Sequence, residues 1–298
     1  MVEVLHSLDL TKTGGQERWV KDIILATKDM DEDVQVITDD IALWRADLSK
    51  PHLYYLTTPR RSLYDMKEYA SPGIKFISPL LVNRDQAKIK QVKNIACISN
   101  TVRDRITRYY NRHSDVIYPC VHCEEYEWKE SHGYWLSVQR VDKWKRVELQ
   151  LEVFRELPDE RLIIVGPIYP KYQDFVLGNE VPDNVSFYGN IKEKALKQIY
   201  SHCEGVLCTS INEDFGIVPL EAMASGKPVV AVDEGGYRET VVDMITGCLV
   251  DADKYGIKEG IEDCPNYPEM CIEQANRFDY QVFKDTLQEK VRKVFMDK

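Results

Sequence analysis

The chain has 298 residues, 44% hydrophobic and 30% charged, and its formal net charge is −10. This length allows two domains of ordinary size, and the composition is typical of globular proteins with a buried core. The acidic balance argues against a nucleic-acid partner, because phosphate backbones attract proteins through Lys and Arg. No stretch has the roughly 20 apolar residues of a membrane span, and no basic leader opens the chain, so we expect a cytoplasmic protein.

The cysteines do not have the spacing of a disulfide framework, so we expect reduced thiols. Cys120 and Cys123 have the spacing of half a zinc site, but no second pair completes four ligands. We therefore predict no metal and no resident cofactor, and a zinc site is the less favoured alternative.

The first half of the chain alternates strand-like and helix-like segments, which predicts a parallel sheet covered on both faces. Strands are expected at 2–8, 34–38, 53–56 and 94–99, and helices after Gly14-Gly15, from about Asp85 to Lys93, and after Ser99. Gly14 and Gly15 allow a ligand to approach the backbone, although a simple turn is the commoner explanation of such a pair. There is no GxGxxG or GxxxxGK[ST] motif, so a nicotinamide enzyme and a P-loop gain no support.

The second half repeats this alternation after an irregular stretch, Cys120 to Gly133, which we interpret as an interdomain linker. Strands are expected at 134–138, 162–165, 185–188, 206–209, 229–232 and 248–250, with helices near 145–156, 192–201, 219–225 and 237–244. This series predicts a second Rossmann-like domain. A last amphipathic helix is expected from 279 to 296.

Residues suited to a diphosphate ligand follow the strands of this second series. Arg140 and Lys145 come after its first strand, where two cations can hold a pyrophosphate, although a solvated basic loop is the commoner alternative. Gly166 follows the second strand and leaves room for a ligand, and the main chain of Asn190 and Ile191 after the third can meet a base. Carboxyl ends of parallel strands share one edge of a sheet, so these residues predict one ligand site.

The stretch from Asn212 to Ser225 is the centre of this predicted site. Glu213 lies in the loop after the fourth strand, and Glu221 is expected in the first turn of a helix that begins at Pro219. Glu221 can accept two ribose hydroxyls and Glu213 can hold hydroxyls of the group on the diphosphate, although an acid at a helix start also complements the helix dipole. Free backbone N–H groups are expected at Gly216, Ile217 and Val218.

This constellation resembles the retaining family-4 glycosyltransferases of GT-B fold. The resemblance covers residues 137–149, 162–166, 184–190, 213–229 and 235–239, and the family's two acids with seven residues between them fall on Glu213 and Glu221. It implies that Glu213 holds the donor sugar, Glu221 the ribose, Arg140 and Lys145 the diphosphate, and Ile191 the base. The implied catalytic residues are Glu213, Arg140 and Lys145. The implied nucleotide-sugar-binding residues are Gly14, Gly15, Gly166, Asn190, Ile191, Phe215, Gly216, Ile217, Val218 and Glu221.

The first half is similar to the same family with more drift. Gly14-Gly15 matches its phosphate-side glycine loop, residues 54–65 resemble a tyrosine-rich stretch of mannosyltransferase-like members, and 98–102 and 116–119 match its domain-closing strands. Thr57 stands where the family's His near the transferring sugar would align.

The resemblance implies an α/β protein with two Rossmann-like doubly wound domains facing across a cleft. The acceptor-side domain is expected at 1–125, short for the family, the nucleotide-sugar domain at 126–278, and a helix at 279–298 crossing back to the first domain. The implied activity is metal-independent, retaining transfer of a hexose from a nucleotide-diphosphate sugar, with GDP-mannose favoured, to a glycan or lipid-linked acceptor. Such an acceptor implies peripheral membrane contact.

Two alternatives remain open: a catalytically weak sugar-nucleotide-binding partner subunit, and a UDP-sugar epimerase-like enzyme of the same fold. The sequence does not decide the donor base, the sugar, the acceptor, the linkage or the oligomeric state.

Overall fold

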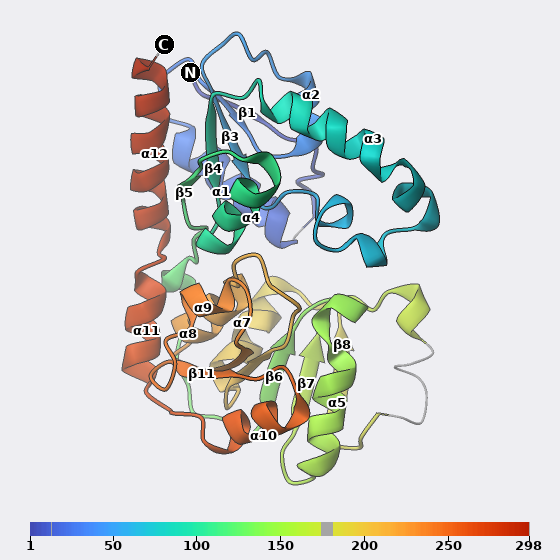
Figure 1. Ribbon diagram of the computed structural model, residues 1–298. Helices are drawn as coiled ribbons and strands as arrows, with labels where there is room; N and C mark the ends of the chain where they lie inside the picture. The colour runs from blue at the N-terminus through green and yellow to red at the C-terminus, as the bar shows by residue number, and fades with distance from the viewer. Residues whose placement is uncertain (13, 174–180, 298) are drawn as a thin grey trace. The chain divides into compact units, whose positions relative to one another are not determined.

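The computed structural model describes residues 1–12, 14–173 and 181–297, and the chain divides into two compact units. The first unit comprises Met1–Cys120 together with Tyr280–Lys298, and the second comprises Val121–Asp279. The chain therefore passes into the second unit after Cys120, a few residues before the expected boundary, and returns to the first unit with its last helix (Figure 1).

The first unit is built on a five-stranded parallel sheet whose strands lie in chain order. They are β1 (Glu3–Leu5), β2 (Gln35–Ile37), β3 (His52–Leu56), β4 (Asn94–Cys97) and β5 (Asp115–Val116). All five residues of β3 are buried, as expected of a strand covered on both faces. The first strand is shorter than the expected 2–8, and its edge position leaves it partly exposed.

The helices of the first unit include the C-terminal one. They are α1 (Gly15–Thr27), α2 (Asp40–Arg45), α3 (Pro72–Ile89), α4 (Asn100–Tyr110) and α12 (Tyr280–Met296), with single 3₁₀ turns η1 (Arg61–Leu63) and η2 (Lys67–Tyr69). Helix α12 packs against α1 and β3 through an apolar stripe that contains Phe283, Leu287, Val291 and Val294. Its Lys290 pairs with Asp115 at 2.5 Å, so ionic contacts flank the stripe.

Helix α3 corrects the expected basic helix from about Asp85 to Lys93. It begins at Pro72, thirteen residues earlier, and contains Pro79 in its interior. Pro79 lacks the N–H that would bond the carbonyl of Lys75, and the hydroxyl of Ser78 donates to that carbonyl at 2.9 Å. The Ser78 side chain thus replaces the hydrogen bond that the proline cannot make. The positions of Pro and Gly in the sequence do not reveal this replacement.

A buried histidine at the start of β3 makes the first unit sensitive to acid. The Nδ1 of His52 lies 2.8 Å from the carbonyl of Lys50, and its Nε2 accepts the Lys93 N–H at 3.1 Å. Burial lowers the pKa of His52 from its ordinary value of 6.5, so the folded unit keeps the ring neutral. Below pH 6.5 the unfolded chain binds a proton that the folded chain does not. The free energy of unfolding therefore decreases as the pH is lowered from 6.5 to the lower pKa of the folded state.

We expect the hydrogen-exchange protection of the Lys93 amide, corrected for its intrinsic rate, to fall as pH decreases below about 6.5. His52→Gln should remove this pH dependence, whereas His113→Gln should not, because the His113 side chain is 85% exposed. Protection in the wild type that is constant from about pH 7.5 to 5.5 would contradict the assignment.

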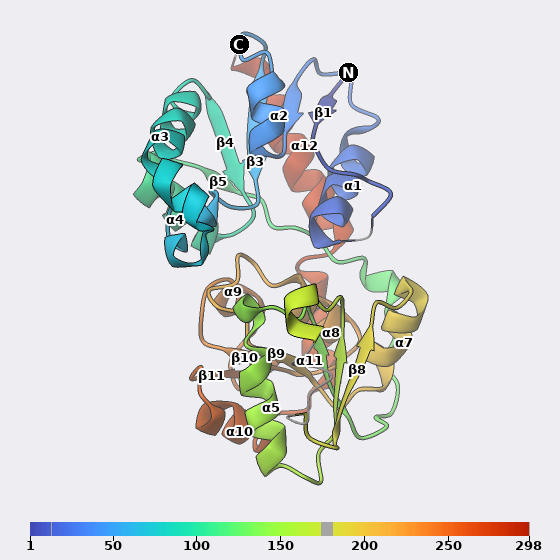
Figure 2. The ribbon, with the colours of Figure 1, turned by 90° about the vertical axis from the view of Figure 1, so that its right-hand side faces the viewer.

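The second unit contains a six-stranded parallel sheet in the order β11-β10-β9-β6-β7-β8. The strands are β6 (Trp135–Val138), β7 (Leu162–Val165), β8 (Val185–Gly189), β9 (Val206–Cys208), β10 (Val229–Val232) and β11 (Gly247–Val250). The chain adds β7 and β8 on one side of β6 and β9 to β11 on the other, so the strand order reverses between β6 and β9 (Figure 2). Ligands of doubly wound sheets bind at such a switch point, beyond the carboxyl ends of the strands.

Helices cover this sheet. They are α5 (Val147–Glu156), α7 (Glu193–His202), α8 (Ile217–Ala224), α9 (Tyr237–Thr240), α10 (Lys254–Glu262) and α11 (Pro268–Asn276), with 3₁₀ turns η3 (Cys123–Glu125), η4 (Lys143–Lys145) and η5 (Pro170–Tyr172). Helices α5 and α10 pack together on one face, where Phe154 and Ile257 join a buried cluster with Leu207 and Val230 of the sheet. Helix α9 ends at Thr240, short of the expected 244.

Candidate functional site

A pocket of about 110 Å³ lies where the strand order of the second unit reverses. Its lining comes from the ends of β6 and β9, the segments that follow them, the start of α8 and helix α9. These residues are Val138, Gln139, Lys145, Leu207, Cys208, Ser210, Glu213, Gly216, Ile217, Val218 and Tyr237. The predicted residues Lys145, Glu213, Gly216, Ile217 and Val218 are therefore brought together at one site.

Lys145 and Glu213 face each other across this pocket. The ammonium of Lys145 donates to a carboxylate oxygen of Glu213 at 2.8 Å, and the two side chains are 21% and 25% exposed. Asp142 begins the 3₁₀ turn that carries Lys145 by accepting the N–H of Trp144, and Thr209 bonds the carbonyl of Lys145 at 2.6 Å. These two hydrogen bonds fix the backbone of the turn that carries Lys145. A polyanion entering the pocket would compete with Glu213 for the Lys145 ammonium group.

The turn between β10 and α9 holds the loop that carries Glu213 through hydrogen bonds. Gly236 donates its N–H to the carbonyl of Glu213 at 2.8 Å, and Glu234 accepts the N–H of Asn212 at 3.0 Å. Gly235 has φ +57°, and a Cβ on it would collide with the backbone of Glu213. Arg146 completes the clamp through a 2.8 Å contact with Glu234. The glycine pair therefore shapes the loop itself, through close backbone contact.

Sequence reasoning did not identify Arg146 or Glu234 as supports of this loop. It also missed Tyr237, whose hydroxyl lies 3.5 Å from the Glu213 carboxylate. Burial, and then the Glu213 charge, raise the pKa of Tyr237 well above its ordinary value, so its phenol stays a neutral donor. The same two causes raise the pKa of the Cys208 thiol. Its position directly after the Gly235-Gly236 pair was the available signal for Tyr237.

Helix α8 starts at Ile217, two residues before the expected start at Pro219. Gly216 takes the N-cap position with φ +99°, a conformation open to glycine, and it has no side chain to cap the first N–H groups. Pro219 is the third helical residue, where its missing N–H still costs no hydrogen bond within the helix. The uncapped N-terminus at Gly216 to Val218 lines the pocket and favours an anion there.

Glu221 lies in the second turn of α8, which corrects its expected place in the first. It is 1% exposed and accepts a 2.7 Å hydrogen bond from the hydroxyl of Tyr200. It is not among the residues that line the pocket. The helix starts earlier than expected, so this position turns inward, toward α7, and the ribose role of Glu221 stays a prediction.

Arg140 is also absent from the pocket lining. Its side chain is 53% exposed, and its guanidinium donates to the hydroxyl of Tyr169 at 3.1 Å and lies 3.5 Å from Asp142. Arg140 and Lys145 both follow β6, but the side chain of Arg140 points to the surface. A role at the diphosphate therefore requires a different side-chain rotamer.

The other predicted residues of the second unit lie around the pocket rather than in its lining. A Cβ on Gly166, at φ +141°, would collide with the carbonyl of Gln139, so this glycine permits close strand contact and does not leave room for a ligand. Asn190 and Ile191 follow β8 at the edge of the sheet, and the two strands β6 and β7 separate β8 from β9. Phe215 is buried, and its backbone packs against Gly236.

Gly14 and Gly15 belong to the first unit, at the start of α1. Gly14 is the N-cap with φ −69°, and a Cβ on Gly15 would meet nothing within 4 Å. Neither position therefore requires glycine for its backbone. Thr57, in the place of the family His, accepts a 3.2 Å hydrogen bond from the side chain of Gln16.

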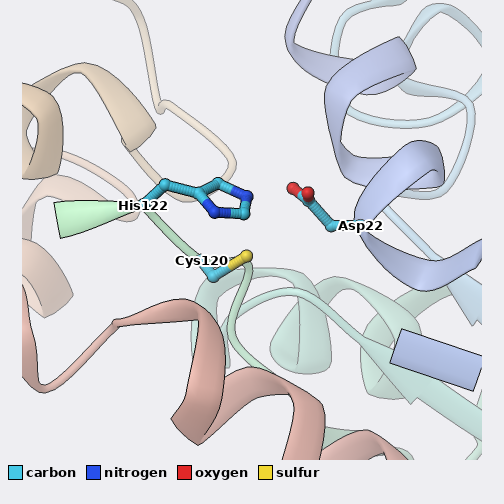
Figure 3. A group of neighbouring side chains, drawn as sticks. All are labelled: Asp22, Cys120 and His122. Atoms are coloured by element: carbon cyan, nitrogen blue, oxygen red, sulfur yellow. The ribbon is translucent and has the colours of Figure 1, made fainter. Parts of the chain in front are cut away.

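The zinc site considered for Cys120 and Cys123 stays a prediction. Asp22 and Cys120 belong to the first unit and His122 to the second, so the three residues in Figure 3 are not a site of one unit. Burial, and then Asp279, raise the pKa of Cys123 to about 12.

The model of the family described as glycosyl transferases group 1 matches residues 122–281, more than half of the chain. The chain belongs to this family. The match spans the whole pocket, so Lys145 and Glu213 both lie within it. The expected glycosyltransferase family is confirmed as glycosyl transferases group 1, and assignment to family 4 with retention stays a prediction.

Curated relatives include two mannosyltransferases. The O-antigen chain mannosyltransferase RfbU of Salmonella typhimurium is 28% identical over 206 residues, 66% of this chain and 58% of that protein. The α-1,3/1,6-mannosyltransferase ALG2 of Mus musculus is 28% identical over 225 residues, 62% of this chain and 54% of that protein. The chain thus matches little more than half of the length of each.

Solved structures confirm the GT-B fold. A sucrose-phosphate synthase from Thermosynechococcus elongatus matches with a TM-score of 0.75 at 17% identity, covering 99% of this chain and 83% of that one. HepE of Anabaena, in complex with UDP-glucose, matches with a TM-score of 0.71 at 18% identity, covering 98% and 99%. Identities this low show the fold alone.

Proposed function

We propose that this chain is a retaining glycosyltransferase of family 4 whose second unit binds the diphosphate of a nucleotide sugar in the pocket between β6 and β9. The observation that carries the proposal is the chemistry gathered there. One ammonium, Lys145, and an uncapped helix N-terminus favour a diphosphate, and one carboxylate, Glu213, can accept sugar hydroxyls. Membership of the glycosyl transferases group 1 family supports it.

In the proposed reaction, the bond between the sugar's anomeric carbon and the diphosphate oxygen breaks, and its electron pair passes to that oxygen. The acceptor hydroxyl attacks the anomeric carbon from the same face, and its proton goes to the leaving phosphate. Lys145 and the N–H groups of Ile217 and Val218 stabilise the negative charge that develops on the diphosphate. Glu213, released from Lys145, orients the sugar hydroxyls. Arg140 adds a second cation once its side chain turns inward.

These protein cations supply the charge that a divalent metal supplies in many sugar-nucleotide sites, so we propose that transfer is metal-independent. We expect the nucleoside of the donor to lie along the carboxyl ends of the same strands. Glu221 would hold the ribose and the main chain of Ile191 the base, as the family resemblance implies.

The donor that we favour is GDP-mannose. Two relatives are named as mannosyltransferases, and residues 54–65 resemble the tyrosine-rich stretch of mannosyltransferase-like members. The solved HepE complex holds UDP-glucose, so the base is the less firmly supported part of this choice. The acceptor that we propose is a glycan or a lipid-linked sugar.

A thermal-shift screen of nucleoside diphosphate sugars tests the donor. A ligand at 100 times its dissociation constant adds about 2.7 kcal/mol to the free energy of unfolding, and we expect GDP-mannose to give the largest shift. NMR of the transferred sugar should then show the anomeric configuration of the donor. Inversion of that configuration would overturn the retaining mechanism, and the absence of any shift would overturn donor binding.

A sugar-nucleotide-binding partner subunit is the second candidate, favoured by Thr57, which stands where the family's His near the transferring sugar would align. Donor binding without transfer to any member of a broad acceptor panel would favour it. A donor returned with altered sugar stereochemistry would instead favour the epimerase-like alternative.

A further inference from the structure

Helices α2 and α3 of the first unit together expose a surface that the proposed transfer reaction does not use. We call it the α2–α3 face and define it by Ile41, Trp44, Phe76, Ile77, Leu80, Arg84 and Lys88. Phe76 is 87% exposed and Leu80 70%, and the other apolar members are each more than two-fifths exposed. Large apolar side chains this open to solvent are unusual as a contiguous group.

Helical periodicity places these residues on one side of α3. Ile77, Arg84 and Lys88 recur at intervals of seven and four and form one stripe, and Phe76 and Leu80 form the adjacent stripe. Arg84 lies 4.3 Å and Lys88 5.4 Å from the ring of Trp44 on α2. The stripe therefore continues onto α2, which lies next to α3 in Figure 1 and lines the same hollow.

A hollow of about 240 Å³ separates the two helices within this face. Ile41, Trp44 and Leu81 line it together with Arg84, and Arg60 pairs with Asp40 at its rim. The hollow therefore offers apolar walls beside a guanidinium group. An acyl chain or glycerol backbone next to a phosphate has this combination of chemistry.

The α2–α3 face is cationic although the chain as a whole is acidic. Helix α3 has three basic residues, Lys75, Arg84 and Lys88, against one acid, a net +2, whereas the chain carries −10. That acid, Asp85, accepts hydrogen bonds from the hydroxyls of Tyr64 at 2.7 Å and Tyr110 at 2.9 Å. Asp40, the other carboxylate beside the hollow, pairs with Arg60.

We propose that the α2–α3 face docks on an anionic membrane surface. Phe76, Ile77 and Leu80 enter the boundary between headgroups and acyl chains, and Arg84 and Lys88 contact lipid phosphates. Trp44 suits the same depth, because an indole has a large apolar body and one polar N–H. None of the described helices is long and apolar enough to cross a bilayer, so this contact is peripheral.

The charge of the face selects the lipid surface over a second copy of the chain. A symmetric dimer through this face would bring Arg84 and Lys88 of one copy close to the same cations of the other. The two carboxylates that line the hollow already have partners, Asp40 in Arg60 and Asp85 in the hydroxyls of Tyr64 and Tyr110. Anionic lipids supply the missing counter-charge.

Co-sedimentation of the full chain with vesicles tests this proposal. We expect binding to phosphatidylcholine vesicles with 30% phosphatidylglycerol, as a rough working fraction, and little binding to phosphatidylcholine alone. Arg84→Gln with Lys88→Gln should weaken binding about thirtyfold, the change that two charges worth about 1 kcal/mol each produce. Phe76→Ser with Leu80→Ser should weaken it at least tenfold.

Matched controls change the same chemistry elsewhere. Lys28→Gln with Arg277→Gln removes two exposed cations, and Tyr255→Ser removes an aromatic that is 70% exposed. These variants should bind vesicles as the wild type does. Thermal shifts with nucleoside diphosphates should be the same in all variants, so failure of membrane docking and failure of donor binding are separate results.

Three outcomes would overturn the proposal. One is equal binding to neutral and anionic vesicles, and another is wild-type binding by both α2–α3 variants. The third is concentration-dependent self-association, seen by sedimentation equilibrium, that Phe76→Ser with Leu80→Ser abolishes, since it would make the face an interface between copies of the chain.

Discussion

Lys145→Ala is expected to lower turnover with a nucleotide-sugar donor by about 10²–10³-fold, the loss seen when one preorganised donor to a developing oxyanion is removed. The pocket provides one ammonium opposite Glu213, and it is this group that meets the leaving diphosphate. The two side chains are 21% and 25% exposed, so removal of the ammonium leaves Glu213 partly buried and should cost roughly 1–3 kcal/mol of stability, which thermal unfolding of the variant measures.

Lys143→Ala is the matched control for Lys145→Ala. Lys143 lies two residues earlier in the same 3₁₀ turn, is exposed and does not line the pocket, so turnover should change less than about twofold. Steady-state kinetics with a saturating acceptor measures both variants. Near-normal turnover of Lys145→Ala would refute the diphosphate role of this lysine.

Gly235→Ala is expected to lower turnover and donor affinity by at least tenfold. A Cβ at this position would collide with the backbone of Glu213 and Asn212, so the loop that carries Glu213 must move. Movement of this loop also breaks the 2.8 Å hydrogen bond from Gly236 to Glu213. The donor sugar would then lose its orienting carboxylate while Lys145 stays in place.

Gly133→Ala separates this effect from backbone strain. Gly133 has φ +70°, close to the +57° of Gly235, but a Cβ there meets only one atom within 4 Å, in the Arg161 side chain at 3.6 Å. Both variants should lose about 1–2 kcal/mol from the unfavourable left-handed backbone. Only Gly235→Ala should lose donor affinity, as measured by calorimetry. Equal affinity in the two variants would show that the loop tolerates the displacement.

The strands of the second unit were the most predictable part of the fold. Leu162–Val165 and Val229–Val232 are observed where they were expected, because strands of a parallel sheet covered on both faces are continuous apolar runs between turns. The proximity of Lys145 and Glu213 also follows from the order of strands and turns. Each comes after a strand next to the reversal of strand order, and carboxyl ends of parallel strands share one edge.

Other features depend on contacts that the sequence pattern does not contain. The start of α8 depends on the left-handed conformation of Gly216, which packs against Tyr237, and Pro219 alone indicates a later start. The burial of Glu221 depends on Tyr200, a residue on another helix. Helix α3 begins at Pro72, before the expected start at about Asp85, and it contains Pro79, whose missing N–H Ser78 offsets.

The central claim is that the pocket between β6 and β9 binds the diphosphate of the donor, and calorimetry with paired ligands tests it most directly. Guanosine and GDP, and uridine and UDP, differ only in the diphosphate that Lys145 and the N-terminus of α8 are proposed to hold. The account predicts that one diphosphate binds the wild type at least 100-fold tighter than its nucleoside, about 2.7 kcal/mol, and that Lys145→Ala removes most of this difference. Equal affinity of nucleoside and diphosphate, or an unchanged difference in Lys145→Ala, would contradict it.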